Sequence, residues 1–157
     1  MSVALPIVLV GLPGAGKSKV GRLLAGRLGV PHVDTDDLIV EREGRAISDI
    51  FATDGESAFR LMETVAVADA LSRRAVVSLG GGAAATDAVR DLLAGHIVVY
   101  IDAPHDELVR RTAAKNPRPL LATDPDGVLR QLRSEREPHY RAVATLTVPT
   151  GPGPAED

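Results

Sequence analysis

The sequence has no cysteine and no tryptophan, and only two phenylalanines and two tyrosines among its 157 residues. The lack of cysteine excludes disulfide bonds, thiolate metal sites and a cysteine nucleophile. No apolar run approaches the roughly 18 residues of a membrane-spanning helix, and the N-terminus lacks the pattern of a secretory signal. The net charge of −3 argues against broad nucleic-acid binding. These features predict one cytoplasmic domain over residues 1–157, which we also expect to be monomeric and bound to neither membrane nor nucleic acid.

Short apolar runs alternate with segments whose apolar residues recur at helical spacing. Strands are predicted at residues 4–10, 31–36, 75–79, 96–102 and 145–148. Helices are predicted at residues 18–29, 36–43, 47–52, 55–74, 86–95, 104–114 and 128–144, with a Pro-rich loop at 115–127. This alternation indicates a parallel sheet with helices on both faces. Ligands of such folds bind beyond the carboxyl ends of the strands.

The segment GLPGAGKS, from Gly11 to Ser18, matches the phosphate-binding pattern G-x-x-x-x-G-K-[ST] between a predicted strand and a predicted helix. Backbone amides of such a loop surround phosphate oxygens, Lys17 reaches the β- and γ-phosphates, and the Ser18 hydroxyl is placed for Mg²⁺. The chain is therefore predicted to bind a nucleoside triphosphate. Because no guanine-reading N-K-x-D occurs, the remaining classes are a nucleotide-hydrolysing switch or motor and a kinase with a small acceptor.

Aspartates follow two of the predicted strands. Asp34 and Asp36 are separated by one residue, so in an extended chain they point the same way. One could serve the metal while the other orients and deprotonates an acceptor hydroxyl. Alternatively, Asp36 and Asp37 cap the helix that follows them. Asp102 resembles the metal-binding strand end of other P-loop proteins, or it marks only the end of a strand.

Arg60 lies three residues before Glu63, a spacing typical of a surface ion pair on a helix. Both phenylalanines of the chain, Phe51 and Phe59, fall in the same region. An apolar wall beside a fixed guanidinium suits a small ligand with a carboxylate, which arginine binds through two hydrogen bonds. Both interpretations remain open from the residues alone.

Two further arginines and a run of glycines are candidates. Arg118 lies in the Pro-rich loop, where it is either solvated or part of a lid over the phosphates. Arg136 is a second possible anion contact. The glycines at 80–82 follow a predicted strand, so either something approaches their backbone closely or the chain turns there.

Together these segments resemble the shikimate kinase family over nearly the whole chain. The matching pieces are GLPGAGKS, DTDDLI, ISDIFATDGESAFRLME, SLGGGA, VRRT, RPLL and REPHYRAVA. The resemblance implies a three-layer α/β P-loop kinase fold, similar to the nucleoside-monophosphate kinases, with a five-stranded parallel sheet of order 2-3-1-4-5. It also implies transfer of the γ-phosphoryl of ATP to the 3-hydroxyl of shikimate, with Mg²⁺, in aromatic amino-acid biosynthesis.

The resemblance further implies a role for individual residues. Asp36 would hold the shikimate hydroxyls, and Arg60 and Arg136 its carboxylate. Nucleotide-binding residues would be Gly14, Ala15, Gly16, Lys17, Ser18, Lys19, Arg110 near the adenine and Arg118 of the lid. Acceptor-binding residues would be Asp36, Phe51, Phe59, Arg60, Glu63, Gly80, Gly81, Gly82 and Arg136, supported by Ile47, Pro119 and Leu120. Lys17, Asp36 and Arg118 would act in catalysis, and Ser18 and Asp34 would serve Mg²⁺.

The substrate segment would span about residues 33–63 and the lid about 112–125. Two departures stand out: Lys19 replaces a threonine usual in the family, and the chain ends where the family has a further helix, which predicts a truncated sequence. The four histidines show no metal-ligand spacing and are expected to be structural or on the surface. Alternatives to shikimate kinase are another small-acceptor kinase of this fold, for gluconate or a nucleoside monophosphate, and a nucleotide-binding regulatory module.

Overall fold

The computed structural model describes residues 4–114 and 124–150. Arg118, Pro119, Leu120, most of the expected lid and the C-terminal segment after Thr150 lie outside these ranges, so the predictions made for them stay predictions. Within the described ranges, no helix combines the length and the apolar composition needed to cross a lipid bilayer.

Five parallel strands form one sheet in the order β2-β3-β1-β4-β5, which confirms the implied topology. The strands are β1 (Ile7–Val10), β2 (His32–Asp34), β3 (Val76–Ser78), β4 (Ile97–Asp102) and β5 (Leu146–Pro149). The central strands β1 and β3 are buried along their whole length, as expected for a sheet covered on both faces. The loops after β1, β2 and β3 therefore leave the same edge of the sheet.

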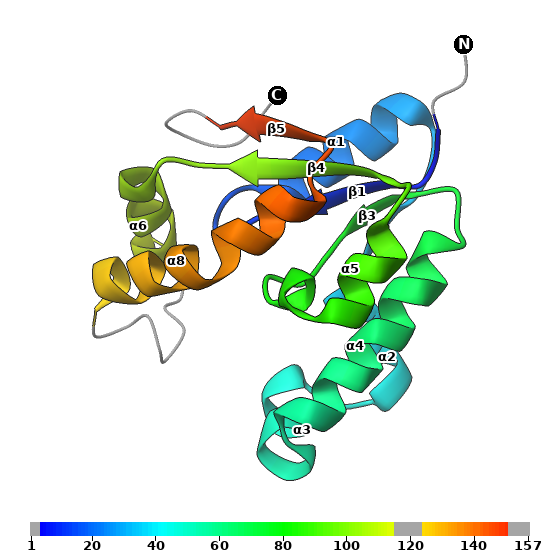
Figure 1. Cartoon of the computed structure of the whole chain (residues 1–157), viewed down its shortest axis with the longest axis horizontal. Coiled ribbons are helices and arrows are strands. Elements are labelled where there is room, and N and C mark those ends of the chain that lie inside the picture. Colours follow the sequence, from blue (N-terminus) through cyan, green and yellow to red (C-terminus); the bar gives the residue numbers. More distant parts are fainter. Residues whose placement is uncertain (1–3, 115–123, 151–157) are drawn as a thin grey trace.

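Helices cover both faces of the sheet and give the three layers that the resemblance implies. They are α1 (Lys17–Leu28), α2 (Thr35–Glu43), α3 (Ile47–Asp54), α4 (Glu56–Leu71), α5 (Asp87–Leu93), α6 (His105–Ala114) and α8 (Pro125–Val143), with a 3₁₀ turn at Ala83–Ala85. Helix α1 lies on one face, and α4, α5 and α8 lie on the other (Figure 1).

Helices α2 and α8 begin earlier than predicted, because an aspartate side chain caps each of them. Asp34 accepts hydrogen bonds from the first-turn amides of α2, so the helix begins at Thr35 and Asp36 is helical rather than extended. Asp124 likewise accepts from the amide of Gly127, and α8 begins at Pro125 inside the stretch predicted to be loop. A proline at the first helical position fits this start, because its missing N–H would have had no helical partner.

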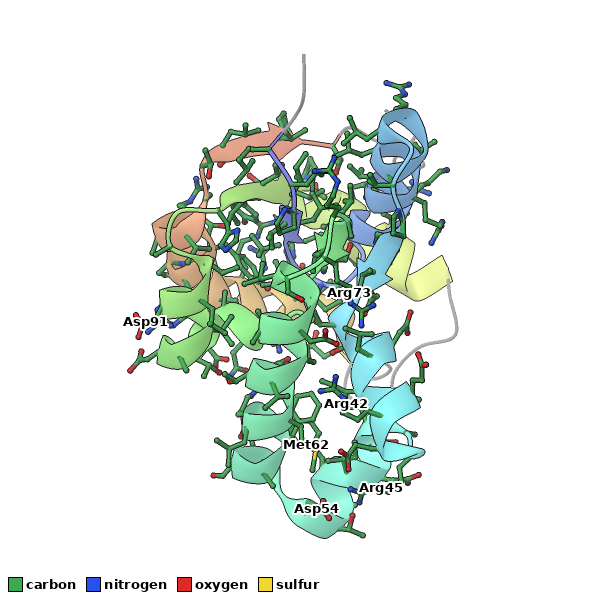
Figure 2. All side chains as sticks on the ribbon, turned by 90° about the vertical axis from the view of Figure 1, so that its right-hand side faces the viewer. Arg42, Arg45, Asp54, Met62, Arg73 and Asp91 are labelled. Carbon is green, nitrogen blue, oxygen red and sulfur yellow. The ribbon has the colours of Figure 1, made fainter. Side chains whose placement is uncertain are left out.

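Helices α2, α3 and α4 form an extension with a small apolar cluster of its own. Ile39, Ile50, Phe59 and Ala66 make up this cluster, apart from the main core around the sheet. Ion pairs add to it: Arg42 contacts Asp69 at 3.1 Å, joining α2 to α4, and Arg45 contacts Asp54 at 2.8 Å. Arg45 and Asp54 lie toward the far end of the extension (Figure 2). Helices α2 and α4 of the extension contact the loop that follows β3, at the carboxyl edge of the sheet.

His32 should make stability depend on pH. Its Nε2 lies 2.8 Å from the hydroxyl of buried Ser78, and it packs so closely under α1 that a Cβ on Gly21 would approach it to 2.6 Å. Burial lowers the pKa of His32, against the opposing charge of Asp34, so the folded chain binds a proton less readily than the unfolded chain. The free energy of unfolding should therefore fall as pH drops below about 6.5.

Urea denaturation between pH 5 and 8 checks this expectation. His32→Asn should show a shallower decline below about pH 6.5 than the parent chain. His96→Asn, at a half-buried histidine just before β4, is the control and should leave the slope unchanged. An equally steep decline in the His32 variant would contradict the assignment.

Candidate active site

The loop after β1 has the shape of a phosphate cradle. Gly14 and Gly16 have φ of 85° and 103°, a left-handed region that only glycine adopts easily. These turns bring Lys17 to the start of α1, where its Nζ donates to the carbonyls of Gly11 at 2.6 Å and Leu12 at 3.3 Å. The exposed Ser18 follows in the first helical turn. The arrangement confirms the strand–loop–helix context predicted for this segment.

Arg111 of α6 supports the loop, a role that was not predicted from the sequence. Its guanidinium donates to the carbonyls of Gly14 at 3.0 Å and Ala15 at 3.2 Å, and it pairs with buried Glu107. The neighbouring Arg110 also pairs with Glu107, but 58% of its side chain is exposed. Two adjacent arginines, three and four residues after Glu107, were a usable signal, because adjacent helical side chains point in different directions and one of the two can face the neighbouring loop.

The residues at the end of β2 cap helix α2 and form a hydrogen bond to the glycine loop. Asp34 Oδ1 accepts from the amides of Asp36 at 2.8 Å and Asp37 at 3.3 Å, so Asp34 is the capping residue. Thr35 is fully buried, and its hydroxyl accepts from the Gly80 amide at 3.1 Å. The expectation that both aspartates point the same way from an extended chain is wrong, because Asp34 is extended at the cap position while Asp36 already lies in the first turn of α2.

Each of the three consecutive glycines faces a different charged side chain. A Cβ built on Gly80 would lie 2.5 Å from Asp36 Oδ1, and one on Gly82 would lie 2.8 Å from an Arg60 nitrogen. A Cβ on Gly81 would lie 2.7 Å from an Arg136 nitrogen. The glycines therefore allow one carboxylate and two guanidinium groups, from three separate helices, to gather over one loop.

Arg60 contacts a buried carboxylate and an aromatic ring. Its Nη1 lies 2.7 Å from Glu63 Oε1, and Glu63 is 1% exposed, so the pair is not the surface pair typical of this spacing. Burial raises the pKa of Glu63, and the hydrogen bond from Arg60 opposes that rise. The ring of Phe59 lies 5.3 Å from the Arg60 guanidinium carbon and 4.6 Å from the ring of Phe51. Arg60 thus has a fixed position beside an apolar wall.

The remaining candidates lie apart from this cluster or support it. Asp102 pairs with Arg133 of α8 at 3.2 Å, a structural role at a strand end. His105 contacts Asp126, and His139 contacts Arg90. Within residues 4–114 and 124–150, no three histidine, aspartate or glutamate side chains converge into a metal site. A Mg²⁺ that arrives with a triphosphate needs only one or two protein oxygens, so this finding is compatible with the predicted cofactor.

Gly82→Ala should impair acceptor binding more than folding. The added methyl group meets the guanidinium of Arg60 rather than backbone, so the guanidinium must shift away from the loop. Weakening one charge-assisted hydrogen bond of about 1.5 kcal/mol should raise the KM of a carboxylate-bearing acceptor roughly tenfold. Gly26→Ala is the matched control, since no heavy atom lies within 4 Å of its Cβ position. Equal acceptor KM values for the two variants would contradict this placement of Arg60.

Comparisons with known proteins agree with the site. The shikimate kinase family profile matches residues 13–157. A shikimate kinase of Mycobacterium avium is 52% identical over 146 residues, covering 91% of this chain and 82% of that protein. One from Thermobifida fusca is 50% identical over 144 residues, covering 91% and 84%. A solved shikimate kinase from Acinetobacter baumannii, in complex with shikimate, has a TM-score of 0.87 at 42% identity, covering 96% of this chain and 86% of that one.

The profile begins within the phosphate-binding loop and includes every residue gathered over the glycine loop. Identity above half with the M. avium protein extends over most of both chains, so the likeness is not confined to the P-loop that many nucleotide-binding families share. On the strength of the family profile, these relatives and the matching fold, the chain belongs to the shikimate kinase family.

Proposed function

We propose that this site transfers the γ-phosphoryl of ATP to the 3-hydroxyl of shikimate and forms shikimate 3-phosphate. The observation that carries the proposal is the gathering of Asp36, Arg60 and Arg136 over three glycines, next to a phosphate-binding loop. Tyr140 contacts the carbonyls of Gly11 and Gly81, so the two loops are neighbours. The solved A. baumannii relative, which holds shikimate, supports the same choice of acceptor.

On the nucleotide side, the amides from Gly14 to Lys19 surround the phosphates and the Lys17 ammonium moves from the Gly11 carbonyl to phosphate oxygens. The loss of a threonine hydroxyl at Lys19 leaves the backbone amide in place. Arg110, exposed on α6, would lie near the adenine, and Arg118, outside the described residues, would serve as the lid arginine over the phosphates. Each of these roles rests on the match to the family's motifs.

Ser18 and Asp34 serve Mg²⁺ in this proposal. The hard cation prefers oxygen ligands, and it usually keeps several waters beside one or two carboxylates and the substrate phosphates. The Ser18 hydroxyl is exposed at the start of α1. Asp34 uses Oδ1 for the helix cap, so Oδ2 is the oxygen that would accept from a metal-bound water. The bound ion would neutralise charge on the phosphate oxygens.

On the acceptor side, Arg60 and Arg136 bind the shikimate carboxylate, with Glu63 and the two phenylalanines holding Arg60 in place. Gly81 contributes a backbone contact to the floor of the pocket. Asp36 orients the 3-hydroxyl and accepts its proton while that oxygen forms a bond to the γ-phosphorus. The bond from the γ-phosphorus to the bridging oxygen breaks, and ADP leaves with the electron pair. Since all these groups lie on one chain, we also propose that it acts as a monomer.

Phosphorus NMR of the reaction tests the assignment of the hydroxyl. Incubation with ATP, Mg²⁺ and shikimate should give one phosphomonoester resonance, coupled to the proton on C3 of the ring. Phosphorylation at another hydroxyl, or formation of inorganic phosphate in place of an ester, would contradict the proposal. Parallel samples with gluconate and AMP test the alternative kinases of this fold.

A further inference from the structure

Tyr140 lies between the two loops on which the proposed function depends. It sits on α8, is 1% exposed, and its hydroxyl lies 3.2 Å from the Gly11 carbonyl. The same hydroxyl donates to the Gly81 carbonyl in the middle of the three glycines. Gly11 begins the phosphate-binding loop, and Gly81 lies in the acceptor loop. One side-chain atom therefore contacts both loops, across sequence separations of 129 and 59 residues.

The hydroxyl is suited to act as a donor. Burial raises the pKa of Tyr140 to about 12, so the phenol keeps its proton throughout the neutral range. A phenol carries a single proton, and two carbonyl oxygens compete for it. The Gly11 oxygen also accepts from Lys17 at 2.6 Å in this structure. When phosphates draw Lys17 away, the Tyr140 hydroxyl remains as a donor close to Gly11.

The position of the ring is well supported. The Tyr100 ring packs against it with centroids 5.3 Å apart, and α8 also carries Arg136 one turn earlier. On the other side of the glycine loop, the Gly80 amide donates to the buried hydroxyl of Thr35. The acceptor loop is thus held between two buried hydroxyls, and only that of Tyr140 also contacts the phosphate-binding loop.

We propose that Tyr140 is a positioning residue that sets the spacing between the phosphate-binding loop and the acceptor loop through its hydroxyl. The inference rests on the proposed function. Tyr140 contacts backbone atoms of both loops, and its effect is to keep the acceptor oxygen in line with the γ-phosphorus. A displacement of about 1 Å between reacting groups can cost roughly a hundredfold in rate.

Tyr140→Phe removes the hydroxyl and keeps the ring. Its matched control is Tyr100→Phe, which removes the other buried tyrosine hydroxyl of the chain, 3.3 Å from Glu137. Steady-state kinetics with ATP and shikimate should show kcat reduced about tenfold in Tyr140→Phe, with each KM changed less than about threefold, because alignment rather than affinity is lost. Tyr100→Phe should keep kcat within about twofold of the parent enzyme. Circular dichroism melts fix an assay temperature at which all three proteins are folded.

The kinetic pattern distinguishes positioning from simple structural support. A kcat in Tyr140→Phe no lower than that of Tyr100→Phe would overturn the inference, and so would raised KM values with an unchanged kcat. If the parent enzyme uses gluconate or AMP instead of shikimate, the same comparison is made with that acceptor. A wrong acceptor assignment therefore shows in the parent enzyme, whereas failure of the inference shows only in the comparison of the two variants.

Discussion

Asp36→Asn should lower kcat by about a hundredfold or more while leaving the KM for ATP nearly unchanged. The amide keeps the size of the side chain and its place beside Gly80, but it cannot accept the proton of the attacking hydroxyl. The effect should fall on kcat because the proton moves in the transition state. Helix α2 should persist, since Asp34 rather than Asp36 caps it.

The exposed neighbour provides the control for this experiment. Asp37→Asn changes a carboxylate in the same helical turn and should retain a kcat within about twofold of the parent enzyme. Initial rates of ADP formation at saturating shikimate give both values. Near-normal turnover in Asp36→Asn would reduce Asp36 to a first-turn acidic residue that only favours the helix.

Arg60→Lys should weaken shikimate binding even though it conserves the charge. A two-pronged contact of guanidinium with carboxylate is worth roughly 2–4 kcal/mol when partly buried, and lysine replaces the planar fork with a single point charge. The KM for shikimate should therefore rise by between about thirtyfold and a thousandfold, with a much smaller change for ATP. A lysine can still neutralise buried Glu63, so loss of that pair does not explain the effect.

Arg73→Lys is the matched control for Arg60. Arg73 follows α4, is exposed and pairs with Asp69 at 2.9 Å, as an ordinary surface ion pair does. Its replacement should leave both KM values within about twofold of those of the parent enzyme. If Arg60→Lys and Arg73→Lys gave the same KM for shikimate, Arg60 would be only the partner of Glu63.

The sequence predicted the loop and helices whose formation depends mainly on residues close to one another in the chain. The phosphate-binding loop could be read from its glycines and their place between a strand and a helix, and helical spacing located α1 and α4 within a few residues. The order of the strands came from the family resemblance, because alternation alone fixes no neighbours. Asp34 as the cap of α2 was missed, since several adjacent aspartates offer equivalent starts to a helix.

Most contacts between distant segments had no signal in the sequence. The spacing of Arg60 and Glu63 is the same for an exposed pair and a buried one, and only the packing of α4 against the rest of the fold decides that Glu63 is 1% exposed. Tyr140 contacts Gly11 from 129 residues away, which no periodicity reports. Arg111 differs from Arg110 only by its direction from α6. The side chains that face the glycine loop are among those that the family resemblance named, and the geometry explains why glycine is needed there.

Measurement of ADP release with different acceptors tests most directly the claim that this site transfers a phosphoryl group to shikimate. The enzyme is assayed with ATP and Mg²⁺ in four parallel reactions containing shikimate, gluconate, AMP or no acceptor. We predict that shikimate alone stimulates ADP release above the level without acceptor. Stimulation by gluconate or AMP in its place would contradict the assignment of the acceptor, and release at one equal rate in all four reactions would contradict phosphoryl transfer to a small molecule.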